Sequence, residues 1–174
     1  MESRAIADAI NARCPSPPLR IDSKYLSWFF DNGMQGNYAR LMIACRGVYI
    51  PLVPKRILGE KSVPYFRETR ERANGGLTLE EIEETVGGDT AWEMAGPVLR
   101  EVTALLMENH HLGPFFLGEE VSFVDFFWAG YLLFMKAIGG EEMLERVVEA
   151  SGENGGVHRE LLEALGRWAG RPSR

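Results

Sequence analysis

The chain has 174 residues, of which 45% are hydrophobic and 25% are charged. This balance is typical of a globular protein and excludes a disordered chain. The length fits one domain, or one domain with a fragment of another. The formal net charge is −6, and the charge is spread along the chain. Because nucleic acids and anionic membrane surfaces require clustered Lys and Arg, we expect neither as a partner.

The two cysteines, Cys14 and Cys45, are too few and too far apart for a disulfide framework or a cysteine-rich zinc site. We therefore expect two free thiols in a reducing compartment. The histidines His110, His111 and His158 do not have the spacing of metal ligands. We expect no metal.

Two further features bear on localisation. The first residues, Met1–Ala12, carry charges throughout and lack the apolar run of a signal peptide. The longest apolar stretch, Phe126–Met135, is shorter than the roughly 20 residues that span a bilayer. We expect a cytoplasmic protein that does not enter membranes.

The first predicted helix is Ser3–Arg13, in which apolar residues form one narrow stripe and Ser3 can cap the first turn. Three prolines follow and predict an extended connector over Cys14–Asp22. The next apolar segments are Ser23–Phe30 and Asn37–Tyr49. Pro51 and Pro54 are expected to end or kink the second of these.

Three further helix starts are predicted from capping patterns. Ser62 precedes a proline and a highly charged segment. Thr78 with Glu81 has the form of a capping box, in which each side chain bonds the other residue's backbone N–H. Thr90 with Glu93 has the same form and begins a helix that runs to about Asn109.

The strongest helix start is Ser122–Asp125, ahead of the nearly uncharged segment Phe123–Ile138. A helix that is apolar on all sides is typical of the centre of a bundle, and Gly139-Gly140 should end it. Because a buried helix must satisfy its first N–H groups internally, we interpret Ser122 and Asp125 as a folding cap. Two amphipathic helices, Glu141–Ala150 and Val157–Ala169, close the chain.

The pair Glu2-Ser3, at the first turn of the opening helix, has two interpretations. It can act as a plain helix cap, which is the simpler interpretation of the pair alone. Alternatively, free backbone N–H groups and the Ser3 hydroxyl bind a carboxylate while Glu2 binds an ammonium group, as a site for a zwitterionic amino acid would require.

Several motifs resemble the glutathione S-transferase family. Glu2–Ala7 followed by Pro15–Leu19 resembles the end of its thioredoxin-like domain and the linker that follows. Gly113–Gly118, with Ser122–Asp125 and Ala129-Gly130 after it, resembles the signature of its C-terminal domain.

A third segment narrows the resemblance. Tyr65–Glu71, with Leu77–Glu81 after it, is similar to the fungal group of these proteins that is related to β-etherases. Together the matches cover most of the chain.

The resemblance implies an all-α fold, a bundle like the C-terminal domain of that family. Residues 1–13 would be the remnant of the thioredoxin-like domain, residues 14–22 the linker, and residues 23–170 the helical domain. The resemblance also assigns Glu2 and Ser3 to the binding of the γ-glutamyl end of glutathione, the co-substrate. The helical domain would supply one wall of the pocket for the acceptor substrate, for which Tyr38, Met42 and Cys45 are our candidates.

The sequence also departs from the family. The strands, the cis-proline and the residue that activates the glutathione thiol are absent from it. Chemistry on glutathione requires that the pKa of its thiol be lowered by a hydrogen-bond donor. Neither Cys14 nor Cys45 lies in a setting that would activate its own thiol instead.

Two functions therefore stay open. The first is a glutathione transferase-like protein that acts on an apolar or aromatic electrophile, in detoxification or in secondary-metabolite biosynthesis. The second is a non-catalytic helical module that binds a small hydrophobic molecule or a protein partner. An apolar face without its neighbouring domain also predicts self-association, for example as a homodimer, although Ile6 and Ile10 can cover part of that face.

Overall fold

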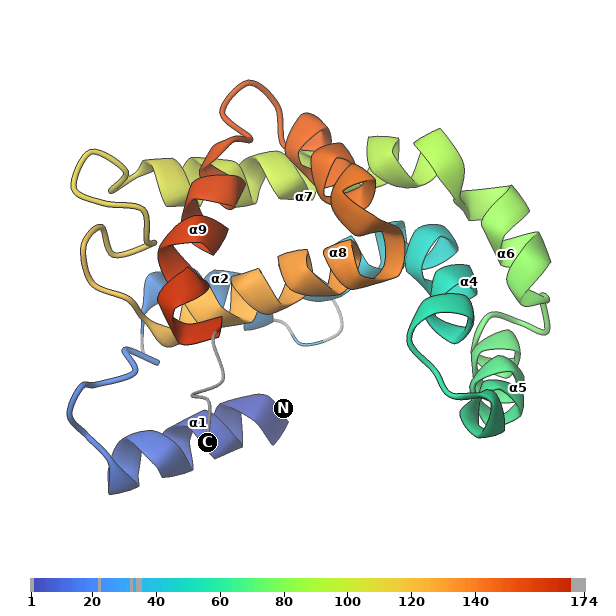
Figure 1. The fold of residues 1–174 in the computed structure, drawn as a ribbon, viewed down its shortest axis with the longest axis horizontal. Helices are drawn as coiled ribbons and strands as arrows, with labels where there is room; N and C mark the ends of the chain where they lie inside the picture. The colour runs from blue at the N-terminus through green and yellow to red at the C-terminus, as the bar shows by residue number, and fades with distance from the viewer. Residues whose placement is uncertain (1, 22, 32, 34–35, 170–174) are drawn as a thin grey trace.

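The computed structural model describes residues 2–21, 23–31, 33 and 36–169, except the side chains of residues 2–4 and 169. Within these ranges the chain is helical and contains no β-strand, which confirms the all-α prediction (Figure 1). The elements are α1 (Glu2–Arg13), α2 (Lys24–Phe30), α3 (Asn37–Ala44), α4 (Arg46–Arg56), a 3₁₀ turn η2 (Glu60–Ser62), α5 (Val63–Ala73), α6 (Leu79–Val86), α7 (Gly88–Met107), α8 (Phe123–Ala150) and α9 (Val157–Ala169).

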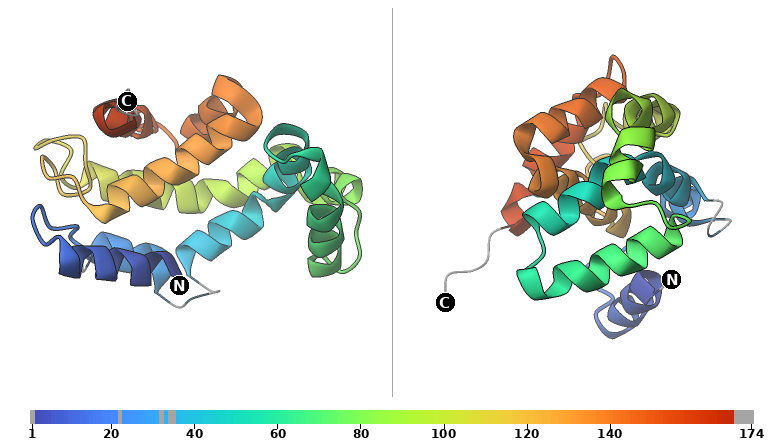
Figure 2. Two further views of the ribbon diagram at one scale, coloured as in Figure 1. Left: turned by 60° about the horizontal axis from the view of Figure 1, so that its bottom comes forward. Right: turned by 90° about the vertical axis from the view of Figure 1, so that its right-hand side faces the viewer.

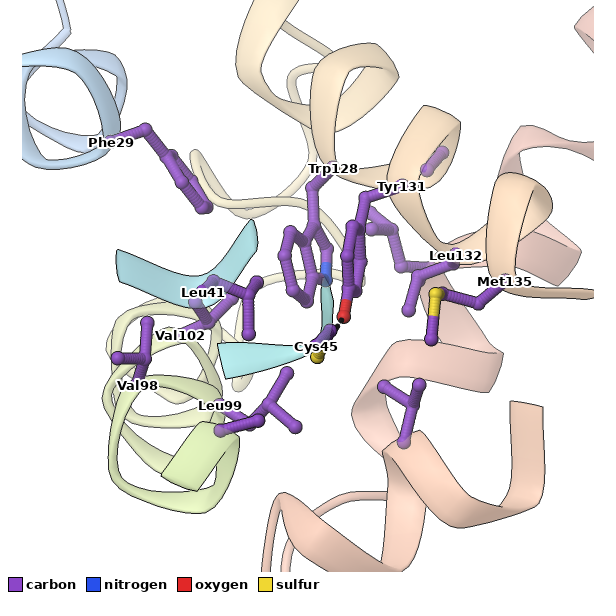
Figure 3. Packing of buried hydrophobic residues seen from close by; sticks show 14 of the residues in the cluster. Phe29, Leu41, Cys45, Val98, Leu99, Val102, Trp128, Tyr131, Leu132 and Met135 are labelled. Carbon is purple, nitrogen blue, oxygen red and sulfur yellow. Dashed lines mark hydrogen bonds between the residues drawn. The ribbon is translucent and has the colours of Figure 1, made fainter. Parts of the chain in front are cut away.

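The core lies between α8 and the helices α2, α3, α7 and α9. Trp128, Leu132 and Met135 project from α8 into this core and are fully buried (Figure 3). The opposite side of α8 is partly exposed, although the sequence predicts a helix that is surrounded by protein on all sides. Phe126 is 39% exposed and Leu133 is 49% exposed. Helix α8 therefore lies at the centre of the bundle, but one of its apolar sides is exposed at the surface.

The predicted end at Gly139-Gly140 is a sharp bend within α8. Gly140 has φ 72°, a left-handed conformation that glycine adopts without strain, and the chain continues as helix to Ala150. By length and composition α8 would suffice to cross a bilayer, but a core helix of a globular protein passes the same test. Here its inner side is packed in the core.

The segment around Pro51 and Pro54 also differs from the prediction. The expected helix Asn37–Tyr49 is divided at Cys45 into α3 and α4, and α4 then runs through both prolines to Arg56. Its close packing against α6 depends on Gly47, where an added Cβ would lie 2.3 Å from the Val86 carbonyl oxygen. Tertiary packing therefore extends α4 beyond the point where the prolines predict its end.

Of the predicted capping patterns, the one at α6 is confirmed. The Thr78 hydroxyl accepts from the Glu81 N–H at 3.2 Å, and the Glu81 carboxylate accepts from the Thr78 N–H at 2.8 Å. The prediction for Thr90 is wrong, because α7 begins at Gly88 and its cap is Gly87, three residues before Thr90. Ser62 is also not a side-chain cap, since it ends the 3₁₀ turn η2 that leads directly into α5.

Helix α1 lies at the edge of the bundle, and both views of Figure 2 show it there. Ala7 is buried, whereas Ile6 and Ile10 are 60% and 50% exposed. The connector after α1 packs back on the bundle, because the Leu19 carbonyl accepts from the Phe123 N–H at 2.8 Å. The connector thus covers the first turn of α8.

Candidate functional site

A row of half-buried side chains follows one face of α3 and α4. Tyr38, Met42, Arg46 and Tyr49 recur at helical spacing, and each is neither fully exposed nor fully buried. This row contains two of the residues expected to line an acceptor pocket, Tyr38 and Met42.

Aromatic side chains of α8 lie against both ends of this row. The Phe127 ring lies 4.8 Å from Tyr38 and 4.7 Å from Phe30 of α2, measured between ring centroids. About two turns further along α8, the centroid of the Phe134 ring lies 5.9 Å from that of the Tyr49 ring. We call these half-buried residues the aromatic wall: Phe30, Tyr38, Met42, Tyr49, Phe127 and Phe134. A surface of this kind can bind the flat face of an aromatic ring.

The two phenols of the wall remain protonated at neutral pH. Burial raises the pKa of Tyr38, and the nearby Tyr49 phenol raises it further. Burial also raises the pKa of Tyr49, whereas the guanidinium groups of Arg70 and Arg46 act against this rise. Both phenols therefore offer a neutral O–H group at the wall.

Cys45, the third predicted pocket residue, lies behind the wall. It is fully buried, and its Sγ lies 3.5 Å from the Tyr131 hydroxyl oxygen in the core (Figure 3). Burial raises the pKa of its thiol to about 11. Because the thiolate is the reactive form, Cys45 in this position is a core side chain and not a nucleophile.

The predicted folding cap at α8 is present, and it does more than close a helix. The Asp125 carboxylate accepts from the Ser122 N–H at 2.7 Å and from the Ser122 hydroxyl at 2.6 Å. Its second oxygen accepts from the Phe116 N–H at 2.9 Å. Asp125 thus fixes the loop before α8, and burial raises its pKa despite these hydrogen bonds.

The predicted glutathione residues, Glu2 and Ser3, occupy the first turn of α1. Because α1 begins at Glu2, Ser3 lies within the helix, and the prediction of Ser3 as its N-cap is wrong. Their side chains lie outside the part of the chain that is described. Their role in binding the γ-glutamyl group stays a prediction.

A second surface lies on the other side of α8. A groove of about 450 Å³ runs between α8 and α9. It is lined mostly by apolar side chains, among them the exposed Phe126, Leu133 and Trp168. Sequence periodicity did not predict this groove, because it placed the whole of α8 in the core.

A buried polar network around His158 was also missed. The Trp128 Nε1–H donates to His158 Nδ1 at 3.0 Å, and His158 Nε2 lies 3.0 Å from the Thr103 hydroxyl. Since the indole is only a donor, Nδ1 carries no proton, and the neutral ring must donate from Nε2 to Thr103. His158 therefore cannot act as a base toward Thr103, and it ties α7, α8 and α9 together. A single histidine in an amphipathic helix carries no sequence signal for such a role.

In the described ranges, no three side chains of His, Cys, Asp or Glu gather in a group that could hold a metal ion. Two surfaces gather partly exposed aromatic side chains, the aromatic wall and the groove between α8 and α9.

Comparisons with known proteins agree with this architecture. Residues 29–168 match the family model of the glutathione S-transferase C-terminal domain. No curated protein matches the chain.

Two solved structures share the fold, both of glutathione S-transferases from Ceriporiopsis subvermispora in complex with glutathione. CsGST63524 has a TM-score of 0.77 and 22% identity, over 99% of this chain and 67% of its own. CsGST83044 has a TM-score of 0.72 and 21% identity, over 93% of this chain and 64% of its own. The chain thus spans about two thirds of the length of these structures, and by its family match it belongs to the glutathione S-transferase C-terminal domain family.

Proposed function

We propose that this chain supplies the acceptor-binding part of a glutathione S-transferase-like protein, with the aromatic wall as the surface that binds an apolar aromatic substrate. The observation that carries the proposal is the contact of partly exposed rings across helices. Phe127 of α8 lies within 5 Å of both Tyr38 and Phe30, measured between ring centroids. Rings that are packed on one side and open on the other are preorganised to bind a further ring.

Glutathione is the proposed co-substrate. Both structural neighbours were solved with glutathione, and the Glu2-Ser3 pair lies at the helix start where an amino-acid carboxylate can be bound. In the part of the chain that is described, Cys45 offers no substitute for an activated glutathione thiol, because its own thiol is buried and protonated.

A second candidate is a non-catalytic module that binds through the groove between α8 and α9. The exposure of Phe126, Leu133 and Trp168 along this groove favours it. An exposed apolar surface of this kind commonly binds a partner or a second copy of the chain.

One experiment separates the two candidates. Binding of the neutral aromatic probe 2-naphthamide is measured by isothermal titration calorimetry for variants of each surface. We expect Tyr38→Leu and Phe127→Leu, which remove a ring but keep apolar volume, to weaken binding roughly three- to tenfold.

The matched controls are Leu133→Ala and Trp168→Leu in the groove, which should leave the affinity unchanged. If the groove variants weaken binding and the wall variants do not, the second candidate is correct. If the probe does not bind at all, the aromatic wall is not an acceptor site.

A further inference from the structure

Helices α3 and α4, which carry Tyr38, Met42 and Tyr49 of the aromatic wall, are basic, although the chain as a whole is acidic. Helices α3 and α4 contain no acidic residue, and their charged residues are all bases: Arg40, Arg46, Lys55 and Arg56. From Phe126 to Gly140, α8 carries only Lys136 as a charged residue. Lys55 is paired with Glu83 of α6, and Lys136 is paired with Glu141, so the base that matters beside the wall is Arg46.

Arg46 lies beside the wall. It occupies the position between Met42 and Tyr49 on the half-buried face of α3 and α4. Its Nη1 donates to the Ile43 carbonyl oxygen at 2.9 Å, which fixes the guanidinium at the helix junction. A guanidinium has five N–H donors, and in the described ranges no carboxylate pairs with those of Arg46.

Arg70 approaches the same end of the wall from α5. Tyr49 and Phe66 pack on one small cluster of buried residues, and the Arg70 guanidinium carbon lies 5.2 Å from the centroid of the Phe66 ring. Other arginines of α5 are engaged, since Arg67 pairs with two glutamates and Arg72 with one. Arg70 has no carboxylate partner in the part of the chain that is described.

We propose that the wall selects aromatic compounds that carry a carboxylate. The ring would lie along Met42 between Phe127 and Phe134, and the carboxylate would accept N–H groups of Arg46 and Arg70 beside Tyr49. Arg46 follows Met42 by four residues, just after the helix divides at Cys45, so a compound whose ring covers Met42 can extend its carboxylate toward Arg46. This inference rests on the proposed function, because it requires the wall to bind the ring.

The test compares two probes of nearly equal shape, 2-naphthoate and neutral 2-naphthamide, by isothermal titration calorimetry at low salt. We expect naphthoate to bind at least about tenfold more tightly, because charge-assisted hydrogen bonds to arginine are stronger than neutral ones. Arg46→Gln and Arg70→Gln should each reduce this ratio severalfold, because each lowers the affinity for naphthoate more than the affinity for naphthamide. The ratio should also fall as salt is raised.

Arg72→Gln is the matched control, since Arg72 lies on the same helix as Arg70 and is already paired with Glu68. It should leave the ratio unchanged. Equal binding of the two probes, or a ratio that does not respond to Arg46→Gln and Arg70→Gln, would overturn this inference while the proposed function stands. Failure of both probes to bind would overturn the proposed function with it.

Discussion

Two helices of this chain begin with the same kind of capping box but in opposite surroundings. At the start of α6 the box of Thr78 and Glu81 is exposed, and its hydrogen bonds lower the pKa of Glu81. At the start of α8 the box of Ser122 and Asp125 is buried, and there burial outweighs the hydrogen bonds and raises the pKa of Asp125. The same local sequence pattern therefore joins α8 to a loop in the buried box, whereas in the exposed box it only begins α6.

The difference lies in what each carboxylate holds. The Glu81 carboxylate accepts from the N–H and the hydroxyl of Thr78, three residues away. Asp125 also accepts from the Phe116 N–H, nine residues away, where water cannot replace it. Removing a buried acceptor leaves its donors without a partner, which costs more than the mean value of a hydrogen bond. The comparison therefore predicts unequal effects for equivalent substitutions.

The largest effect is expected for Asp125→Ala. It leaves the Phe116 N–H and the two donors of Ser122 unsatisfied, so the free energy of unfolding should fall by about 3 kcal/mol. Urea titration of both proteins measures this. Asp125→Asn, which keeps one acceptor oxygen, should lose less. A loss below about 1 kcal/mol for Asp125→Ala would mean that the buried box acts no differently from an exposed one.

The second largest effect on stability is expected from His158, a buried residue that is hydrogen-bonded to Trp128 of α8. Burial lowers the pKa of His158 from 6.5 to about 4, so the unfolded chain binds a proton between these values and the folded chain does not. Its contribution to stability is therefore complete above pH 6.5 and is lost as the pH falls toward 4. Between pH 7 and pH 5 we expect a loss of about 2 kcal/mol.

The measurement is urea unfolding at both pH values for the parent protein and for His158→Gln. Glutamine can accept from the Trp128 N–H and donate to Thr103, yet it does not titrate. The difference between the two proteins isolates His158 from Asp125, whose raised pKa acts in the opposite direction. His111→Gln is the control, because His111 is exposed. If His158→Gln shows the same pH dependence as the parent, His158 does not carry the effect.

The sequence predicted the helical class and the cap at α8 because both depend on local patterns. Apolar spacing identified α8 as a core helix, and Ser122 with Asp125 identified where it begins. The link from Asp125 to Phe116 could not be predicted, because it joins a helix to a loop whose conformation has no sequence signature.

The candidate site was predicted only in part. Tyr38 and Met42 lie on the wall, but Cys45 faces the core, because it lies on the inner edge of the same apolar stripe, beside the buried Leu41 and Ala44. Phe127 and Phe134 were assigned to the core along with the rest of α8. Periodicity shows that a helix is apolar on several sides, and it does not show which side the neighbouring helices leave open.

The smallest effect is expected at the exposed box. Thr78→Ala removes the acceptor for the Glu81 N–H at the start of α6, and a lost cap of this kind typically costs about 1 kcal/mol. Water can reach the freed N–H, and among the described residues the Thr78 side chain hydrogen-bonds Glu81 alone, so the loss should stay local. Urea titration should show a smaller shift than for Asp125→Ala, and hydrogen exchange should accelerate in α6 and not in α8. Thr78→Ser, which keeps the hydroxyl, is the control. A shift as large as that of Asp125→Ala would show that α6 is required for the whole bundle, and that burial of the box is not what separates the two caps.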